Sequence, residues 1–218
     1  MRCFIRQISA VVQSVTYKLP IVYNDVIAAL KSAVRLPALP YTVSIASNRT
    51  AAAPENNVIF AGTGTGEAPH NSMTIELLKR GHTGQIVSMT CVRYRGDLGY
   101  LDQQKQLQEK YPNYHYGSFT TREPENIDSN HPQYVGKQYL QDMVVPDKFE
   151  AQFGWSPKPG KTHVFLCGNP SMIGLPEKND QGELVFPESK GMVELLTEQG
   201  YKLSTPKSPG NIHFEKYW

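Results

Sequence analysis

The chain has 218 residues, a length that fits one or two domains. Its formal net charge is only +2 and no apolar run reaches the about 20 residues of a membrane-spanning helix, so nothing indicates a nucleic-acid-binding or membrane protein. Three widely spaced cysteines and scattered histidines exclude a disulfide framework and a metal or iron–sulfur site, and they favour a reducing compartment such as the cytoplasm.

Residues 1–56 differ in composition from the rest of the chain. Asp25 is the only acid before Pro54, as in an organelle transit peptide, but a basic surface or a poorly folded tail explains this equally simply, and we favour that interpretation. A short helix is predicted over 25–34 and a linker over 51–57.

The stretch VIFAGTGTGEAPH, residues 58–70, is the most informative part of the sequence. It predicts a buried strand over 58–61, a glycine turn over 62–66 and a helix over 69–80. Glycines let the backbone approach a pyrophosphate, and the helix N-terminus offers N–H groups and the positive end of a dipole. Because Glu67 replaces the third glycine of G-x-G-x-x-G, a simple tight turn is the alternative interpretation.

Strands and helices alternate through the remaining chain. Further strands are predicted over 85–94, 114–121, 162–167 and 211–215, and helices over 98–111, 136–144 and 191–199, the second with Tyr139, Leu140 and Met143 facing inward. The connection over 146–159 looks irregular or briefly helical. Alternation of this kind predicts βαβ units and a parallel sheet covered on both faces. The expected fold class is therefore α/β, with a five-stranded, Rossmann-like parallel sheet.

Candidate binding residues follow the predicted strands, where ligands of open parallel sheets bind. They are Gly62, Thr63, Gly64, Thr65 and Gly66, then Arg93, then Thr121 and Arg122, then Cys167 and Gly168, and last Glu215, Tyr217 and Trp218.

Glycines and arginines in this pattern suit a phosphorylated dinucleotide. We expect Arg122, helped by Lys137, to pair with a 2′-phosphate, and Tyr139 to stack on adenine. No acid stands about 20 residues after the glycines, the position that marks NAD selectivity, so the sequence favours NADP.

Cys167 and the chain's last residues each allow two interpretations. A lone strand cysteine is usually a small buried residue, but Cys167 precedes Gly-Asn-Pro, so its sulfur could face a ligand. Terminal residues are usually polar and frayed, so Tyr217 and Trp218 suggest a lid over a flat ring system instead of core.

These residues together resemble the ferredoxin/flavodoxin–NADP reductase family. The segments that match in order and spacing, from about Asn57 to the end, are GTGTGEAP (62–69), VRYRGDLGY (92–100), TRE (121–123), KQYLQ (137–141), Cys167-Gly168 with Met172, and EKYW (215–218). The resemblance implies an NADP-binding domain over 57–218, hydride exchange between NADPH and FAD, and electron transfer to ferredoxin or flavodoxin.

The resemblance also implies roles by position. The 2′-phosphate and adenine site is matched by Thr121, Arg122, Lys137 and Tyr139, and the pyrophosphate and nicotinamide side by Gly64, Thr65, Gly66 and Arg93. Cys167 matches the cysteine beside the nicotinamide C4, and Glu215 the acid of the hydride-transfer pocket. Tyr217 matches the aromatic residue that stacks on the flavin, and Trp218 extends past it as in some bacterial members. Glu67 and His70 depart from the common glycine motif, which has an apolar residue and Phe there.

The larger departure lies upstream, where the family has a flavin-binding β-barrel. Only 56 residues precede the NADP domain, and the flavin-holding motif Arg-x-Tyr-Ser is absent. So short a segment cannot close a six-stranded barrel at about 5–6 residues per strand plus turns. We expect residues 1–56 to be a truncated or poorly ordered remnant, which puts FAD binding in question. The alternative function is a solitary NADP-binding module or gene fragment without flavin or activity of its own. An oxygenase reductase component with an added 2Fe–2S module is excluded by the cysteine count.

Overall fold

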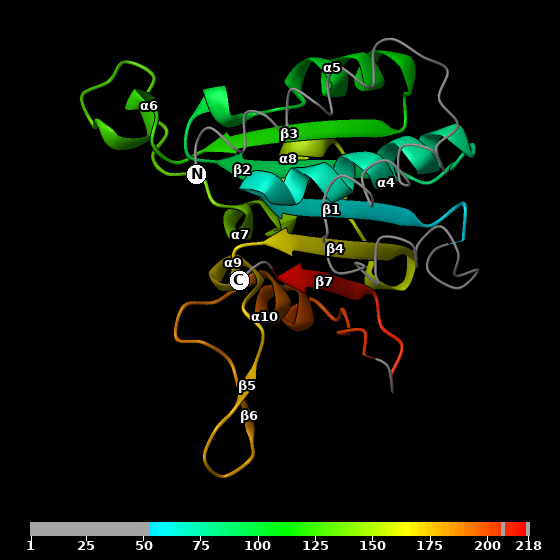
Figure 1. The fold of residues 1–218 in the computed structure, drawn as a ribbon, viewed down its shortest axis with the longest axis vertical. Helices are drawn as coiled ribbons and strands as arrows, with labels where there is room; N and C mark the ends of the chain where they lie inside the picture. Colours follow the sequence, from blue (N-terminus) through cyan, green and yellow to red (C-terminus); the bar gives the residue numbers. More distant parts are fainter. Residues whose placement is uncertain (1–52, 206–207, 217–218) are drawn as a thin grey trace, which may run out of the picture. The chain divides into compact units, whose positions relative to one another are not determined.

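A computed structural model describes residues 53–205 and 208–216. Five parallel strands form its central sheet, in the order β3-β2-β1-β4-β7 (Figure 1). The strands are β1 (Asn57–Thr63), β2 (Ile86–Val92), β3 (Tyr114–Thr120), β4 (Thr162–Gly168) and β7 (Ile212–Lys216). The predicted five-stranded parallel sheet is confirmed. The helix predicted over 25–34 and most of the predicted remnant lie outside the described residues, as do Tyr217 and Trp218.

Helices cover both faces of this sheet. The longer ones are α4 (Glu67–Lys79), α5 (Leu101–Lys110), α8 (Pro146–Phe153) and α10 (Met192–Glu198). Single-turn helices are α6 (Pro124–Ile127), α7 (Leu140–Met143) and α9 (Pro170–Ile173), and 3₁₀ turns are η1 (Gly64–Gly66), η2 (Arg95–Asp97) and η3 (Pro159–Lys161). A two-stranded hairpin, β5 (Glu177–Lys178) with β6 (Leu184–Val185), projects from the connection between α9 and α10 (Figure 1). No helix in the described ranges is long and apolar enough to cross a bilayer.

Alternate residues of the central strands build two separate cores. Phe60 of β1 packs with α4 and α5 on one face, whereas Ile59 of β1 packs with α7 to α10 on the other. Every residue of β2 is buried, because both of its faces are covered and it lies between β1 and β3. This two-sided burial explains why β1 and β2 are mostly apolar.

The helix predicted over 136–144 is wrong in its first half. Only Leu140–Met143 is helical, and Tyr139, predicted to face inward, is 45% exposed. Gly136 has a positive φ of 72°, and the backbone N–H of Gln138 donates to the carbonyl of Thr120 at the end of β3. These two features hold the segment before Leu140 in a non-helical conformation.

The helix predicted over 98–111 begins later, at Leu101. Residues Arg95–Asp97, just before the predicted range, form a 3₁₀ turn in which the Asp97 carboxylate accepts a hydrogen bond from the backbone N–H of Tyr94. The short helices α6 and α9 and the hairpin β5–β6 were not predicted, because each is too short to show a period.

Gly66 is required by close packing between η1 and β4. A Cβ at this position would overlap the carbonyl oxygen of Cys167, which is backbone and cannot turn away. We therefore expect Gly66→Ala to lower the free energy of unfolding by about 2–3 kcal/mol, as measured by urea denaturation. Gly96→Ala is the control, since no atom lies within 4 Å of its added Cβ. Equal destabilisation by the two substitutions would contradict this packing.

Candidate functional site

The carboxyl ends of the five strands meet at one edge of the sheet, as expected for parallel strands. The register pairs Gly62 of β1 with Thr90 of β2 and with Cys167 of β4, and it pairs Cys167 with Glu215 of β7. Paired residues on neighbouring strands point to the same face of a sheet. Three predicted site residues from separate parts of the chain, Gly62, Cys167 and Glu215, therefore form one row on the face that carries α4.

The glycine turn joins β1 to α4 at this edge. Gly64 has a positive φ of 55°, is exposed, and has open space where a side chain would lie. Thr65 is exposed as well, whereas Gly66 is buried against β4. The free backbone at the head of the 13-residue helix α4 suits a negatively charged ligand group.

Thr63 and Gly168 hold the ends of β1 and β4 together. The hydroxyl oxygen of Thr63 accepts a hydrogen bond of 2.8 Å from the backbone N–H of Asn169. Gly168 has a φ of 129°, and a side chain there would overlap Thr63. Both residues were predicted as cofactor contacts, and the structure shows them in contact with each other.

Glu67 is the one acid in the first turn of α4, and its side chain is buried. The Tyr116 hydroxyl donates a 2.8 Å hydrogen bond to its carboxylate, so the group points toward β3 and not toward the glycine turn. Burial raises the pKa of Glu67, an effect that the hydrogen bond from Tyr116 partly opposes. The hydrogen bond from Tyr116 therefore ties the first turn of α4 to β3.

His70 is buried beneath the end of β1. Burial lowers its pKa to about 3, so the ring is neutral at ordinary pH. The ring lies with its centroid 5.1 Å from that of Phe60 and close to Gly62. A neutral imidazole therefore fills the place of the phenylalanine that is common in the glycine motif.

Two arginines lie side by side at the ends of β2 and β3. Arg93 and Arg122 are both exposed, and the backbone N–H of Arg122 donates to the carbonyl of Arg93 at 2.9 Å. The Thr121 hydroxyl lies 3.5 Å from the Val92 carbonyl. The hydrogen bond from Gln138 to Thr120 brings the exposed Lys137 and Tyr139 to the same end of β3. The predicted 2′-phosphate and adenine residues thus come from two segments that meet at one strand end.

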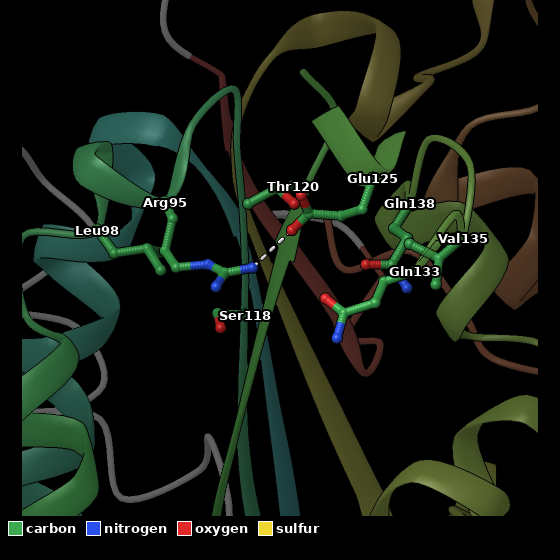
Figure 2. Close-up of a pocket in the computed structure, with 8 residues that line it drawn as sticks. All are labelled: Arg95, Leu98, Ser118, Thr120, Glu125, Gln133, Val135 and Gln138. Carbon is green, nitrogen blue, oxygen red and sulfur yellow. Dashed lines mark hydrogen bonds and ion pairs between the residues drawn. The ribbon is translucent and has the colours of Figure 1, made fainter. Parts of the chain in front are cut away.

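A pocket of about 330 Å³ opens over the end of β3 (Figure 2). Ser118 and Thr120 of β3 form its floor. Arg95 and Leu98 lie on one side of it, and Gln133, Val135 and Gln138 on the other. An ion pair of 2.7 Å between Arg95 and Glu125 bridges the two sides.

Arg95 belongs to the matched segment VRYRGDLGY but received no role from the sequence, and Glu125 was not predicted. Arg95 stands in the arginine-rich segment after β2, which is a signal for an anion site, but nothing in the sequence marks Glu125 as its partner. The floor residue Thr120 and the wall residue Gln138 are direct neighbours of the predicted Thr121, Lys137 and Tyr139. None of the predicted 2′-phosphate residues lines the pocket itself, which therefore adjoins the predicted site along the chain.

Cys167 and Glu215 occupy the other end of the row. Cys167 is 2% exposed, which agrees with the interpretation as a small buried residue. Glu215 is partly exposed, and burial raises the pKa of its carboxyl. No group of three or more His, Cys, Asp or Glu residues suited to a metal ion occurs within residues 53–205 and 208–216.

Comparison with known proteins identifies the family. Residues 60–178 match the family described as oxidoreductase NAD-binding domain. The chain belongs to this family. It is 28% identical over 136 residues to ferredoxin–NADP reductase B of Sorangium cellulosum, across 62% of this chain and 52% of that one. It is 29% identical over 157 residues to a flavodoxin/ferredoxin–NADP reductase of Buchnera aphidicola, across 72% of this chain and 54% of that one.

A solved structure shares the fold. The ferredoxin NADP⁺ reductase from Neisseria gonorrhoeae with bound FAD and NADP aligns with a TM-score of 0.55 and 19% identity, over 74% of this chain and 56% of that one. The resemblance to the ferredoxin–NADP reductase family is thus confirmed. The chain spans about half the length of the curated relatives that it matches.

The buried Glu67 predicts a pH-dependent stability. A carboxyl whose pKa is raised by folding binds its proton more tightly in the folded state. The protonated carboxyl therefore contributes to stability at low pH, and this contribution is lost as the pH rises above 4.5, the ordinary pKa of the group. Glu67→Gln keeps an acceptor for Tyr116 but cannot ionise. We expect its free energy of unfolding, relative to the wild type, to rise between pH 4.5 and pH 8 by about 1.4 kcal/mol for each unit of pKa shift.

Urea denaturation at several pH values measures this difference. Glu109→Gln, on the exposed surface of α5, is the control for a change of one charge. A difference between Glu67→Gln and wild type that does not vary with pH would contradict the assignment.

Proposed function

We propose that this chain is the NADP(H)-binding part of an oxidoreductase of the ferredoxin–NADP reductase type. The observation that carries the proposal is the common edge at which the glycine turn, the paired arginines and the row of Gly62, Cys167 and Glu215 meet. The family match and the names of the relatives support it. Ferredoxin or flavodoxin is the proposed electron partner, and the cytoplasm the proposed location.

The strand order gives the dinucleotide a direction along this edge. Arg122 follows β3, the glycine turn follows β1, and Cys167 lies on β4, three strand spacings of about 4.8 Å from β3. We assign the 2′-phosphate to Arg122 and Lys137, the pyrophosphate to the backbone of Gly64–Gly66, and the nicotinamide to the side of Cys167 and Glu215.

The backbone and side chains of this edge then act by binding and orientation. The exposed backbone of Gly64 and Thr65 binds the pyrophosphate, and the Glu67 carboxylate is directed away from it by its hydrogen bond from Tyr116. The raised pKa of Glu215 suits a carboxyl that donates a hydrogen bond or a proton beside the reacting ring. By resemblance, Cys167 lies beside the nicotinamide.

FAD, when bound, accepts the hydride and passes electrons singly to the partner protein. By resemblance, Tyr217 and Trp218 cover the flavin, but they lie outside the described residues. Flavin binding is therefore a separate part of the proposal, measured by the visible absorption spectrum of the purified chain with added FAD. Bands of a bound flavin would support it, and a colourless protein that binds NADPH would limit the function to NADP(H) binding.

Arg122→Ala tests the 2′-phosphate assignment. Loss of a charge-assisted hydrogen bond to phosphate weakens binding by about ten- to a hundredfold. We therefore expect the Kd for NADPH to rise by that factor and the Kd for NADH to change little, as measured by fluorescence titration. Lys79→Ala removes an exposed cation from the other end of α4 and is the matched control. Equal losses of NADPH and NADH affinity would contradict the assignment.

A further inference from the structure

The pocket over the end of β3 contains both of the side-chain types that proteins use to distinguish the two nicotinamide cofactors. In dinucleotide-binding domains, a carboxylate that accepts a hydrogen bond from the ribose 2′-hydroxyl favours NAD, and an arginine that binds the 2′-phosphate favours NADP. Arg95 and Glu125 line the same pocket and form an ion pair across it (Figure 2). No acid stands at the usual NAD-type position after the glycines. Glu125, in the segment after β3, places an acid in this pocket instead.

The two members of the pair differ in burial. The side chain of Glu125 is 20% exposed, and that of Arg95 is 67% exposed. Glu125 belongs to α6, whose segment is held by hydrogen bonds from Val135 to the Glu125 carbonyl and from Asn126 to the Gly136 carbonyl. The carboxylate therefore has a fixed position, while the guanidinium extends into solvent.

The backbone of Arg95 is fixed, although its guanidinium is exposed. Its N–H donates a 2.5 Å hydrogen bond to the carboxylate of Glu123. Only one guanidinium nitrogen, Nη2, bonds to Glu125, and a guanidinium has five N–H donors. An exposed ion pair of this kind is weak, so a phosphate dianion can compete with Glu125 for Arg95.

We propose, on the basis of the proposed function, that the Arg95–Glu125 pair distinguishes a 2′-phosphate from a 2′-hydroxyl on the ribose and makes the site accept both NADP(H) and NAD(H). A 2′-phosphate takes Arg95 from Glu125 and leaves the carboxylate unpaired close to a dianion, which opposes NADP(H). A 2′-hydroxyl leaves the ion pair intact and donates a hydrogen bond to the second oxygen of Glu125, which favours NAD(H). Arg95 and Arg122 therefore both favour binding of the phosphorylated cofactor, and Glu125 opposes it.

The test compares NADP⁺ and NAD⁺, which differ only in the 2′-phosphate, on the full chain by isothermal titration calorimetry. The selectivity is the ratio of the Kd for NAD⁺ to the Kd for NADP⁺. We expect Glu125→Gln to raise this ratio about tenfold, and Arg95→Ala to lower it about tenfold, each corresponding to one charge-assisted hydrogen bond.

Two exposed residues of α5 outside the pocket provide matched controls. Glu109→Gln and Lys105→Ala change the net charge by the same amounts and should leave the ratio unchanged. Thermal unfolding of each variant shows whether the fold is kept, and Arg95→Lys provides a second arginine variant that keeps the charge but not the fork of donors.

The outcomes separate this inference from the proposed function. A ratio that neither Glu125→Gln nor Arg95→Ala alters, in a chain whose NADP⁺ affinity still depends on Arg122, would overturn the inference alone. Binding of NADP⁺ without detectable binding of NAD⁺ to the wild-type chain would also overturn it. Failure to bind either cofactor would overturn both this inference and the proposed function.

Discussion

The close approach of η1 to the end of β4 is the constraint on which the site depends. Gly66 lies directly against the carbonyl of Cys167, and Gly168 lies against Thr63. Only glycine fits at these two positions, so two of the glycines serve the protein's own packing. Gly64 is different, because the space that a side chain would occupy is empty and the residue is exposed. The turn therefore combines a rigid base with one exposed edge, which is the arrangement that a pyrophosphate requires.

Two buried polar side chains, Glu67 and His70, lie beneath this turn. Glu67 is buried at the head of α4 with its carboxyl directed to Tyr116, and burial favours its protonated form. His70 is neutral because burial lowers its pKa. The acid at the first residue of α4 is thus bonded to β3 and directed away from the glycine turn, and the neutral histidine adds no charge there. The charged side chains that remain exposed, Arg93 and Arg122, lie toward β3 and extend the anion site in that direction.

Much of the fold was predictable because buried parallel strands have a simple pattern. Runs such as Ile86–Val92 and Thr162–Gly168 are apolar and bounded by polar or glycine residues, and the parallel pairing then brings their ends together. The helix over 136–144 was mispredicted because Leu140 matches a helical pattern, while the positive φ of Gly136 depends on its contacts. The Arg95–Glu125 pair was not predictable, since 30 residues separate its members and only the pairing of β2 with β3 brings them together. The roles of Tyr217 and Trp218 stay predictions.

Hydrogen–deuterium exchange of the chain with and without NADP⁺ tests the central claim most directly, because it reports on each backbone segment without requiring flavin or turnover. If the dinucleotide binds along the carboxyl edge of the sheet, NADP⁺ should slow exchange of the amides at Gly64–Glu67 and in the segments after β2 and β3, with little change in the hairpin β5–β6. Protection confined to other parts of the chain, or no protection at saturating NADP⁺, would contradict the account.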